Sequence, residues 1–213
     1  AGYGVELDIQ YSKDMKIVVF HDATLSRMCG VDKKVSECTY EELLNYSLDG
    51  TDEKIPLFSE VLEILSGAPL VCEIKNHNGN RNYKLCEDAF ELLKNYKGLY
   101  CVESFSPFLV KWFRKVHHEI VRGQLSCSFR RDKEVDPATG FIMRNLLINF
   151  ISRPDFISYR HKDTNTLGFK ACSKIFNPLL IGWTAKGNEE QELAWKKFNS
   201  VIFERLKDYN PNE

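Results

Sequence analysis

Short apolar segments typical of strands alternate with amphipathic segments typical of helices along most of this chain. We predict strands at residues 4–9, 70–75, 99–105, 119–125, 155–159, 179–184 and 200–204. Helices are predicted between them, one beginning at Pro107 and another over roughly 141–151. Strand–helix units that repeat at roughly 30 residues form right-handed crossovers and a parallel sheet. The number of repeats favours a closed (β/α)8 TIM barrel, and no Gly-x-Gly-x-x-Gly or Walker loop supports an open nucleotide-binding sheet.

Composition limits the class of protein. A length of 213 residues with 43% hydrophobic content predicts one domain over residues 1–213. The net charge of −1 gives no electrostatic case for nucleic acid, and no apolar run is long enough for stable membrane insertion. The seven cysteines are scattered without Cys-x-x-Cys spacing, which predicts free thiols in a reducing compartment, the cytoplasm.

Polar side chains occupy one face of the first predicted strands. Side chains alternate along a strand, so Glu6 and Asp8 share a face, and Glu73 and Lys75 share a face in the next unit. Helices cover the outside of a parallel barrel, so these four side chains are expected to point inward at the strand ends, where barrel enzymes hold their chemistry. A short hairpin returns the chain to bring His21 beside them.

Three carboxylates in one place repel one another, and burial increases the repulsion. Either some are protonated or a cation lies among them. An all-oxygen ligand set indicates a hard ion, Ca²⁺ or Mg²⁺, and disfavours zinc. Lys75 is suited to an anionic oxygen such as that of a phosphate. The alternative is an internal ion pair between Lys75 and one of the acids, with no metal.

These residues also match a known family. Glu6-Leu7-Asp8, then the stretch His21-Asp22-Ala23-Thr24-Leu25-Ser26-Arg27, then Glu73-Ile74-Lys75, resemble the glycerophosphodiester phosphodiesterases. The resemblance extends from Gly2 to about Glu204, with further matches at the ends of predicted strands: Glu103-Ser104-Phe105, Gly123-Gln124-Leu125 and Gly182-Trp183-Thr184.

The resemblance implies hydrolysis of glycerophosphodiesters to glycerol 3-phosphate and an alcohol, in glycerophospholipid metabolism, with a divalent cation. It implies metal ligands at Glu6, Asp8 and Glu73, catalytic roles for His21 and Lys75, and substrate contacts from Lys75, Phe105 and Trp183. A small-molecule glycerophosphodiester is the implied partner, and a homodimer is compatible with the resemblance.

The sequence departs from the family at its start. Family members begin with a strand that ends in His-Arg-Gly, followed by Pro-Glu-Asn and a helix, and this chain starts after that point. The segment would supply the histidine partner of His21, and without it we expect an unstable and nearly inactive protein.

Two alternatives differ in class. A phospholipase C- or D-like lipid phosphodiesterase would need an apolar or basic docking rim, and no basic amphipathic segment is evident. A non-catalytic barrel that binds metal or phosphate would follow if the first strand is truly absent.

Overall fold

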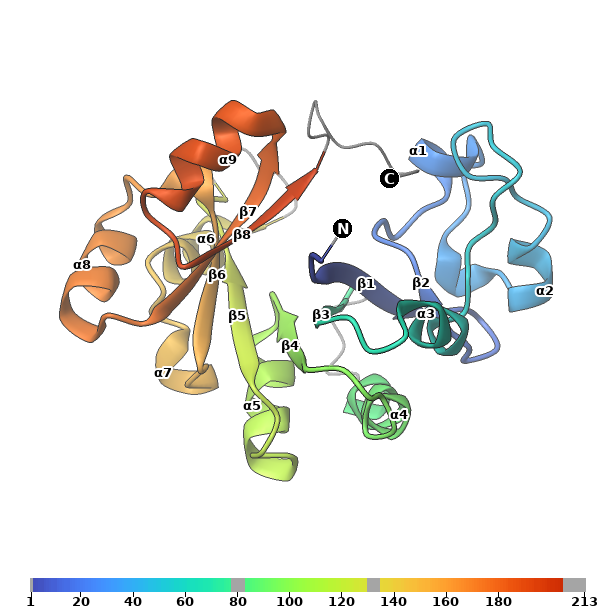
Figure 1. The fold of residues 1–213 in the computed structure, drawn as a ribbon, viewed down its shortest axis with the longest axis horizontal. Helices are drawn as coiled ribbons and strands as arrows, with labels where there is room; N and C mark the ends of the chain where they lie inside the picture. The colour runs from blue at the N-terminus through green and yellow to red at the C-terminus, as the bar shows by residue number, and fades with distance from the viewer. Residues whose placement is uncertain (1, 78–82, 130–134, 205–213) are drawn as a thin grey trace. The chain divides into compact units, whose positions relative to one another are not determined.

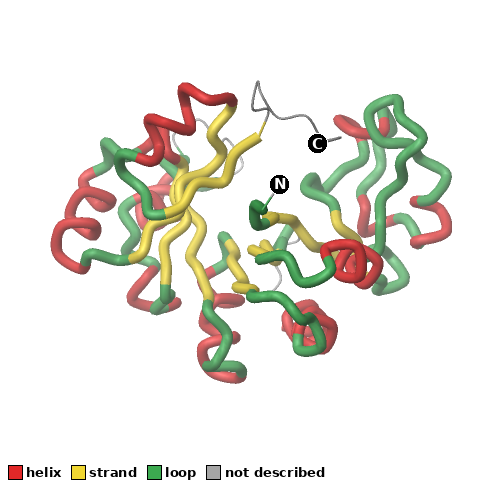
Figure 2. The backbone as a smooth tube through the Cα atoms, viewed as in Figure 1, coloured by secondary structure: helices red, strands yellow, loops and turns green. Residues whose placement is uncertain are grey.

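The computed structural model describes residues 2–77, 83–129 and 135–204 (Figure 1). The chain divides into two compact parts, an N-terminal half over Gly2–Val102 and a C-terminal half that begins at Glu103. Each half is built from strands and helices in alternation, and Figure 2 distinguishes the two kinds of element by colour.

The N-terminal half contains a sheet in the order β2-β1-β3-β4. Strand β1 pairs in antiparallel fashion with β2 and in parallel with β3, where Asp8 lies opposite Glu73. The predicted hairpin forms because the Ser12 hydroxyl donates to the Asp14 carboxylate and holds a tight turn. The strands are β1 (Val5–Tyr11), β2 (Ile17–Val19), β3 (Leu70–Ile74) and β4 (Tyr100–Ser104).

An excursion of the chain after β2 has a small apolar core of its own. Leu25, Leu43 and Ile55 are fully buried in it. A capping box is present: the Thr39 hydroxyl accepts from the Glu42 backbone N–H, and the Glu42 carboxylate accepts from the Thr39 backbone N–H. The helices of this half are α1 (Ser26–Cys29), α2 (Tyr40–Leu43), α3 (Phe58–Leu65) and α4 (Tyr83–Leu93), with a 3-10 turn at Val35–Glu37.

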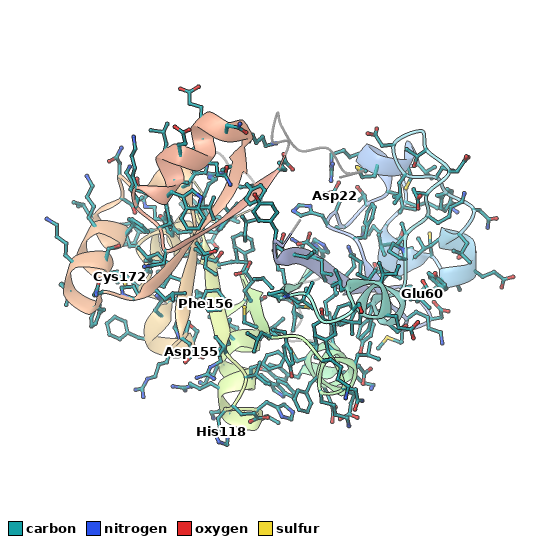
Figure 3. The ribbon with its side chains drawn as sticks, in the orientation of Figure 1. Asp22, Glu60, His118, Asp155, Phe156 and Cys172 are labelled. Carbon is teal, nitrogen blue, oxygen red and sulfur yellow. The ribbon has the colours of Figure 1, made fainter. Side chains whose placement is uncertain are left out.

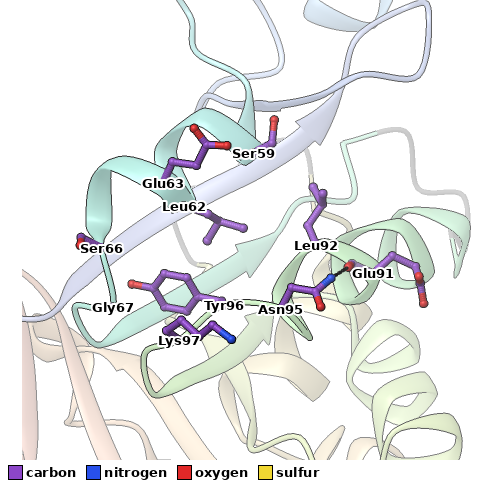
Figure 4. A pocket seen from close by; sticks show the side chains of 10 residues that line it. All are labelled: Ser59, Leu62, Glu63, Ser66, Gly67, Glu91, Leu92, Asn95, Tyr96 and Lys97. Atoms are coloured by element: carbon purple, nitrogen blue, oxygen red, sulfur yellow. Dashed lines mark hydrogen bonds between the residues drawn. The ribbon is translucent and has the colours of Figure 1, made fainter.

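A groove of about 430 Å³ lies between α3 and the end of α4 (Figure 4). Leu62, Leu92 and Tyr96 give it an apolar floor, while Glu63, Glu91 and Lys97 lie at its edges. The Tyr96 hydroxyl donates to the Ala68 carbonyl and so tethers the chain that leads into β4.

The C-terminal half contains neighbouring strands in the order β5-β6-β7-β8, with each adjacent pair parallel. Gly123 is required in β5, since a Cβ there would lie 2.1 Å from the Phe156 ring of β6. Tyr159, Phe169 and Leu180 belong to the core of this half. The strands are β5 (Arg122–Ser126), β6 (Phe156–Arg160), β7 (Leu179–Lys186) and β8 (Ser200–Glu204).

The single helix predicted over roughly 141–151 is wrong. Two helices, α6 and α7, occupy this segment, because Leu146 adopts a positive φ of 59° and buries its side chain in the core. The predicted strand at 119–125 begins only at Arg122, since the Ile120 N–H donates to the His117 carbonyl and closes a turn. The helices are α5 (Pro107–Val116), α6 (Pro137–Arg144), α7 (Asn149–Ser152), α8 (Leu167–Phe176) and α9 (Gly187–Trp195), with a 3-10 turn at His161–Asp163.

The predicted strands and free thiols are confirmed, and a single domain over residues 1–213 stays a prediction. A strand is present at each of the predicted barrel positions, and β2 is added to them as the second arm of the hairpin. The cysteines carry free thiols, as predicted. Within the described ranges, no helix combines the length and apolar character that crossing a membrane requires.

Candidate active site

Three carboxylates converge on the N-terminal half of the sheet. Glu6 and Asp8 share one face of β1, and Glu73 occupies the matching position of the parallel neighbour β3. Each offers an oxygen atom, and these atoms lie within 4.8 Å of one another. The structure therefore brings together the three residues that the sequence predicted as metal ligands.

Lys75 lies directly against this cluster. Its Nζ is 2.8 Å from Asp8 Oδ1 and 2.8 Å from Glu73 Oε1, and its side chain is only 8% exposed. Burial opposes the charged form of the ammonium, but the carboxylates of Glu73 and Asp8 raise the pKa of Lys75 above its ordinary value. The ion pair considered as an alternative to a metal site is thus present, and it engages two of the three acids.

One ammonium does not neutralise three carboxylates. Burial, with the charges of Asp8 and Glu73, raises the pKa of Glu6 to about 8. Burial and the charge of Asp8 also raise the pKa of Glu73, against the opposing effect of Lys75. The cluster thus favours additional positive charge, and its all-oxygen donor set fits a hard divalent cation such as Ca²⁺ or Mg²⁺.

The backbone around His21 is hydrogen-bonded to strand β1 and to the loop that follows β3. The Phe20 N–H donates to the Asp8 carbonyl at 3.0 Å. The Gln10 side-chain amide donates to the carbonyls of Phe20 and Asp22, at 2.7 and 2.8 Å. On the other side, the His77 Nε2–H donates to the His21 carbonyl at 3.1 Å. His21 is therefore anchored next to the strand that carries Glu6 and Asp8, while its side chain stays 63% exposed.

Asp22 orients the His21 ring. Its Oδ1 lies 2.6 Å from His21 Nδ1, and its Oδ2 accepts from Arg27 Nε at 2.6 Å. Partial burial would raise the pKa of Asp22, but the hydrogen bonds from Arg27 and His21 lower it. The ionised carboxylate only accepts, so the His21 Nδ1 carries the hydrogen and Nε2 is the nitrogen that can exchange a proton. Figure 3 labels Asp22.

The sequence analysis assigned no role to Asp22, Arg27, Gln10 or His77. Asp22 and Arg27 belong to the stretch from His21 to Arg27 that carried the family resemblance, so that motif was the available signal. Gln10 shares the face of Glu6 and Asp8 by strand alternation. For His77, the only available signal was its position shortly after Lys75 in the sequence.

The other two predicted site residues lie together in the C-terminal half. The rings of Phe105 and Trp183 are 5.7 Å apart in a T-shaped arrangement. The Gln124 amide donates to the carbonyls of Ser104 and Phe105, which fixes the chain at the end of β4. The Trp183 indole N–H is buried and finds no acceptor among the residues that the structure describes. A polar atom of a ligand would satisfy it.

Comparison with known proteins identifies the family. The sequence model of the glycerophosphoryl diester phosphodiesterase family matches residues 2–167. The chain belongs to this family. The match includes the acidic cluster, Lys75, His21 and Phe105, and it ends before Trp183.

Curated relatives match parts of the chain. Lysophospholipase D GDPD1 of Rattus norvegicus is 37% identical over 105 residues, which are 44% of this chain and 32% of the relative. A glycerophosphodiester phosphodiesterase of Caldanaerobacter subterraneus is 26% identical over 133 residues, which are 57% of this chain and 54% of that protein. The chain thus spans about a third of the length of the mammalian relatives it matches and about half that of the bacterial enzyme.

Solved structures show the same fold. A phosphodiesterase of Oleispira antarctica, solved with its product sn-glycerol 3-phosphate, aligns with a TM-score of 0.74 at 20% identity, over 94% of this chain and 81% of that one. The glycerophosphodiester phosphodiesterase of Thermotoga maritima aligns with a TM-score of 0.66 at 24% identity, over 94% and 80%. These neighbours are TIM barrels, so the predicted fold class is confirmed.

Proposed function

We propose that this protein hydrolyses glycerophosphodiesters to glycerol 3-phosphate and an alcohol with the help of a divalent cation. The observation that carries the proposal is the convergence of Glu6, Asp8 and Glu73, with Lys75 inserted between two of them, in a chain of this family. His21 on the adjoining strand end completes a set of groups suited to phosphodiester chemistry.

The three carboxylates would hold Ca²⁺ or Mg²⁺. When bound, such an ion supplies positive charge that offsets the phosphodiester anion and polarises its oxygens. Lys75 is the nearest fixed ammonium and would bind a phosphate oxygen. His21 would give or take a proton at Nε2, with Asp22 holding the ring in place.

The aromatic pair supports a role in substrate recognition. Trp183 and Phe105 offer apolar surface to a glycerol or alcohol moiety, and the Trp183 N–H can donate to a substrate oxygen. The seven free thiols support a cytoplasmic location. A homodimer remains a prediction from the sequence.

A second candidate substrate is a lysophospholipid. The mammalian relatives that share 34–37% identity with this chain are named lysophospholipase D. A lysophospholipid carries the same phosphodiester and glycerol and adds one acyl chain, so the polar groups described above would serve both substrates.

The test is release of glycerol 3-phosphate from glycerophosphocholine and glycerophosphoethanolamine, measured with Ca²⁺, with Mg²⁺ and with EDTA on protein of verified intact mass. Release of lysophosphatidic acid from lysophosphatidylcholine is measured in parallel. Turnover that requires a metal ion supports the proposal, and the ratio of the two products separates the two substrates.

His21→Ala is the decisive variant and His118→Ala is its matched control, because His118 lies on the surface after α5, 87% exposed. We expect His21→Ala to lose turnover and His118→Ala to keep the wild-type rate. If the full-length gene product binds Ca²⁺ or Mg²⁺ in a calorimeter but hydrolyses neither substrate, the protein is a metal-binding barrel and the proposed activity is wrong.

A further inference from the structure

Large apolar side chains are exposed on three helices of the C-terminal half. Phe150 of α7 is 75% exposed and Leu167 of α8 is 83% exposed. Monomeric soluble proteins rarely leave such side chains together in water, and where they do the surface commonly binds a partner or a membrane. The exposed members that define this surface are Phe141, Phe150, Ile151, Leu167, Ile175 and Phe176.

The start of α8 lies against the end of α6, and α7 follows α6 in the chain. The Gly168 N–H at the start of α8 donates to Asn145 Oδ1 at the end of α6, at 3.1 Å. The backbones are so close that a Cβ on Gly168 would lie 2.2 Å from the Asn145 Cα. The end of α6 is also bound to the sheet, because the Tyr159 hydroxyl of β6 donates to the Arg144 carbonyl. We call the exposed side chains of these three helices the α6–α8 surface.

Apart from Asp136, which caps the start of α6, the charged side chains of the α6–α8 surface are basic. Arg144, Arg153, Lys170 and Lys174 lie on its helices or at their ends, and none forms an ion pair within the described part of the chain. Arg144 instead lies over the Phe141 ring, 5.1 Å from its centroid.

Between residues 137 and 187 the sequence has two acids, and each is engaged elsewhere. Asp155 pairs with Arg122 and Asp163 pairs with Arg160. The α6–α8 surface is therefore positive, although the whole chain has a net charge of −1.

Apolar side chains interspersed with unpaired basic ones match the chemistry of an anionic lipid bilayer. The apolar groups enter the boundary between headgroups and acyl chains, while arginine and lysine reach the lipid phosphates. A second copy of this chain fits less well, since a symmetric dimer would set these four cations against the same four. We propose that the α6–α8 surface docks the protein on the surface of an anionic bilayer.

This surface is not visible in the sequence as one basic amphipathic helix. The positive φ of Leu146 breaks the segment into α6 and α7, so the exposed side chains on either side do not follow a single helical period. Lys170 and Lys174 come from a third helix, which only the fold brings alongside.

The test is sedimentation of the full chain with vesicles of phosphatidylcholine alone or of phosphatidylcholine mixed with phosphatidylserine. We expect binding to the mixed vesicles and little to the neutral ones. Binding should weaken as salt rises from about 0.1 M to about 1 M, because the Debye length falls from about 10 Å to 3 Å. Lys170→Gln with Lys174→Gln should weaken binding about 25-fold, about fivefold for each charge.

Phe150→Ser with Phe176→Ser should also reduce vesicle binding. The matched control is Ile64→Ser with Leu99→Ser, which removes two equally exposed side chains (79% and 83%) from the N-terminal half and should leave binding unchanged. All four positions are exposed, so a preserved circular dichroism spectrum and melting temperature are expected for both pairs.

Equal affinity for neutral and mixed vesicles, or no binding to either, would overturn the proposal. So would a dimer in light scattering that the Phe150 and Phe176 changes dissolve, because the surface would then join two copies. None of these measurements needs turnover, so they stand or fall independently of the proposed hydrolysis.

Discussion

The two halves of the chain use the same strand–helix alternation for different chemistry. In the N-terminal half, the buried polar side chains at the strand ends are ionisable and crowded: Glu73 and Lys75 are buried beside Asp8. In β5 and β6 of the C-terminal half, the polar side chains with no exposed surface are neutral, namely Gln124, Ser126 and Ser158, and the buried Arg122 is paired with Asp155. The surfaces differ as well, since the α6–α8 surface concentrates exposed apolar and basic groups.

The difference shows that the fold fixes where the buried side chains at the strand ends lie, while the residue at each position decides whether it carries a charge. A carboxylate at such a position is costly until a cation compensates it, whereas the neutral amide of Gln124 carries no charge to compensate, and its N–H groups donate to nearby carbonyls. The N-terminal half is thus suited to hold a metal ion and move a proton, and the C-terminal half is suited to recognise apolar and lipid groups. Each prediction below tests this division.

Lys75→Met should have the largest effect. The change leaves Asp8 and Glu73 buried without their cation, so we expect a loss of about 3–5 kcal/mol in the free energy of unfolding in EDTA. Urea denaturation measures it, and Ca²⁺ or Mg²⁺ should restore most of the loss. Lys84→Met is the control, because Lys84 is 62% exposed in its pair with Asp88 and should cost at most about 1 kcal/mol. A loss as small for Lys75 would mean that its charge is unimportant to the cluster.

Asp22→Asn tests whether this carboxylate acts through His21. We expect kcat to fall about 10- to 100-fold, the range for outer-shell partners of a functional histidine, with little change in KM. Steady-state kinetics of the variant measure both constants. Asp32→Asn, at an exposed position of the same loop region, should change neither constant. A KM effect alone would place Asp22 in substrate binding and not behind the histidine.

Trp183→Leu tests the recognition role of the C-terminal half. Loss of the indole removes both apolar contact and the buried N–H, so KM should rise about tenfold while kcat stays nearly constant. Kinetics with glycerophosphocholine measure the change. Trp195→Leu in α9 is the control, as its ring lies half exposed. Equal behaviour of the two variants would remove Trp183 from the proposed substrate contacts.

The pH dependence of stability tests the crowding of the same carboxylates. Glu6 has a pKa raised from 4.5 to about 8 in the folded protein. The unfolded glutamate therefore releases its proton first, and the folded state loses stability as pH rises through this range. In EDTA we expect the melting temperature to fall by about 10 °C between about pH 5 and pH 8. Glu6→Gln should flatten this slope and Glu63→Gln, on the outer helix α3, should not.

Strand alternation was sufficient to predict the acidic cluster. A period of two fixes the face of each side chain, and parallel pairing sets Asp8 opposite Glu73 whatever the loops do. The same reasoning placed Lys75 beside them. These positions depend only on backbone geometry that short sequence patterns encode.

The contacts that sequence did not predict depend on rotamers and loops. The hydrogen bond between the side chains of His21 and Asp22 requires one choice of side-chain torsions. The hydrogen bond from His77 to the His21 carbonyl requires one path of the loop after β3. The break at Leu146 places a leucine in a left-handed conformation that its propensity disfavours, and burial in the core compensates the strain.

Gln10 has a consequence for how this protein can change. The Gln10 side-chain amide, on β1, donates to the carbonyls of the residues on both sides of His21. The hairpin therefore sets the distance between the imidazole and the carboxylates. The long excursion from Met28 to Pro56 leaves and returns after that spacing has been fixed. Its length and sequence are therefore free to drift and to acquire new specificities, while the reaction centre is inherited unchanged.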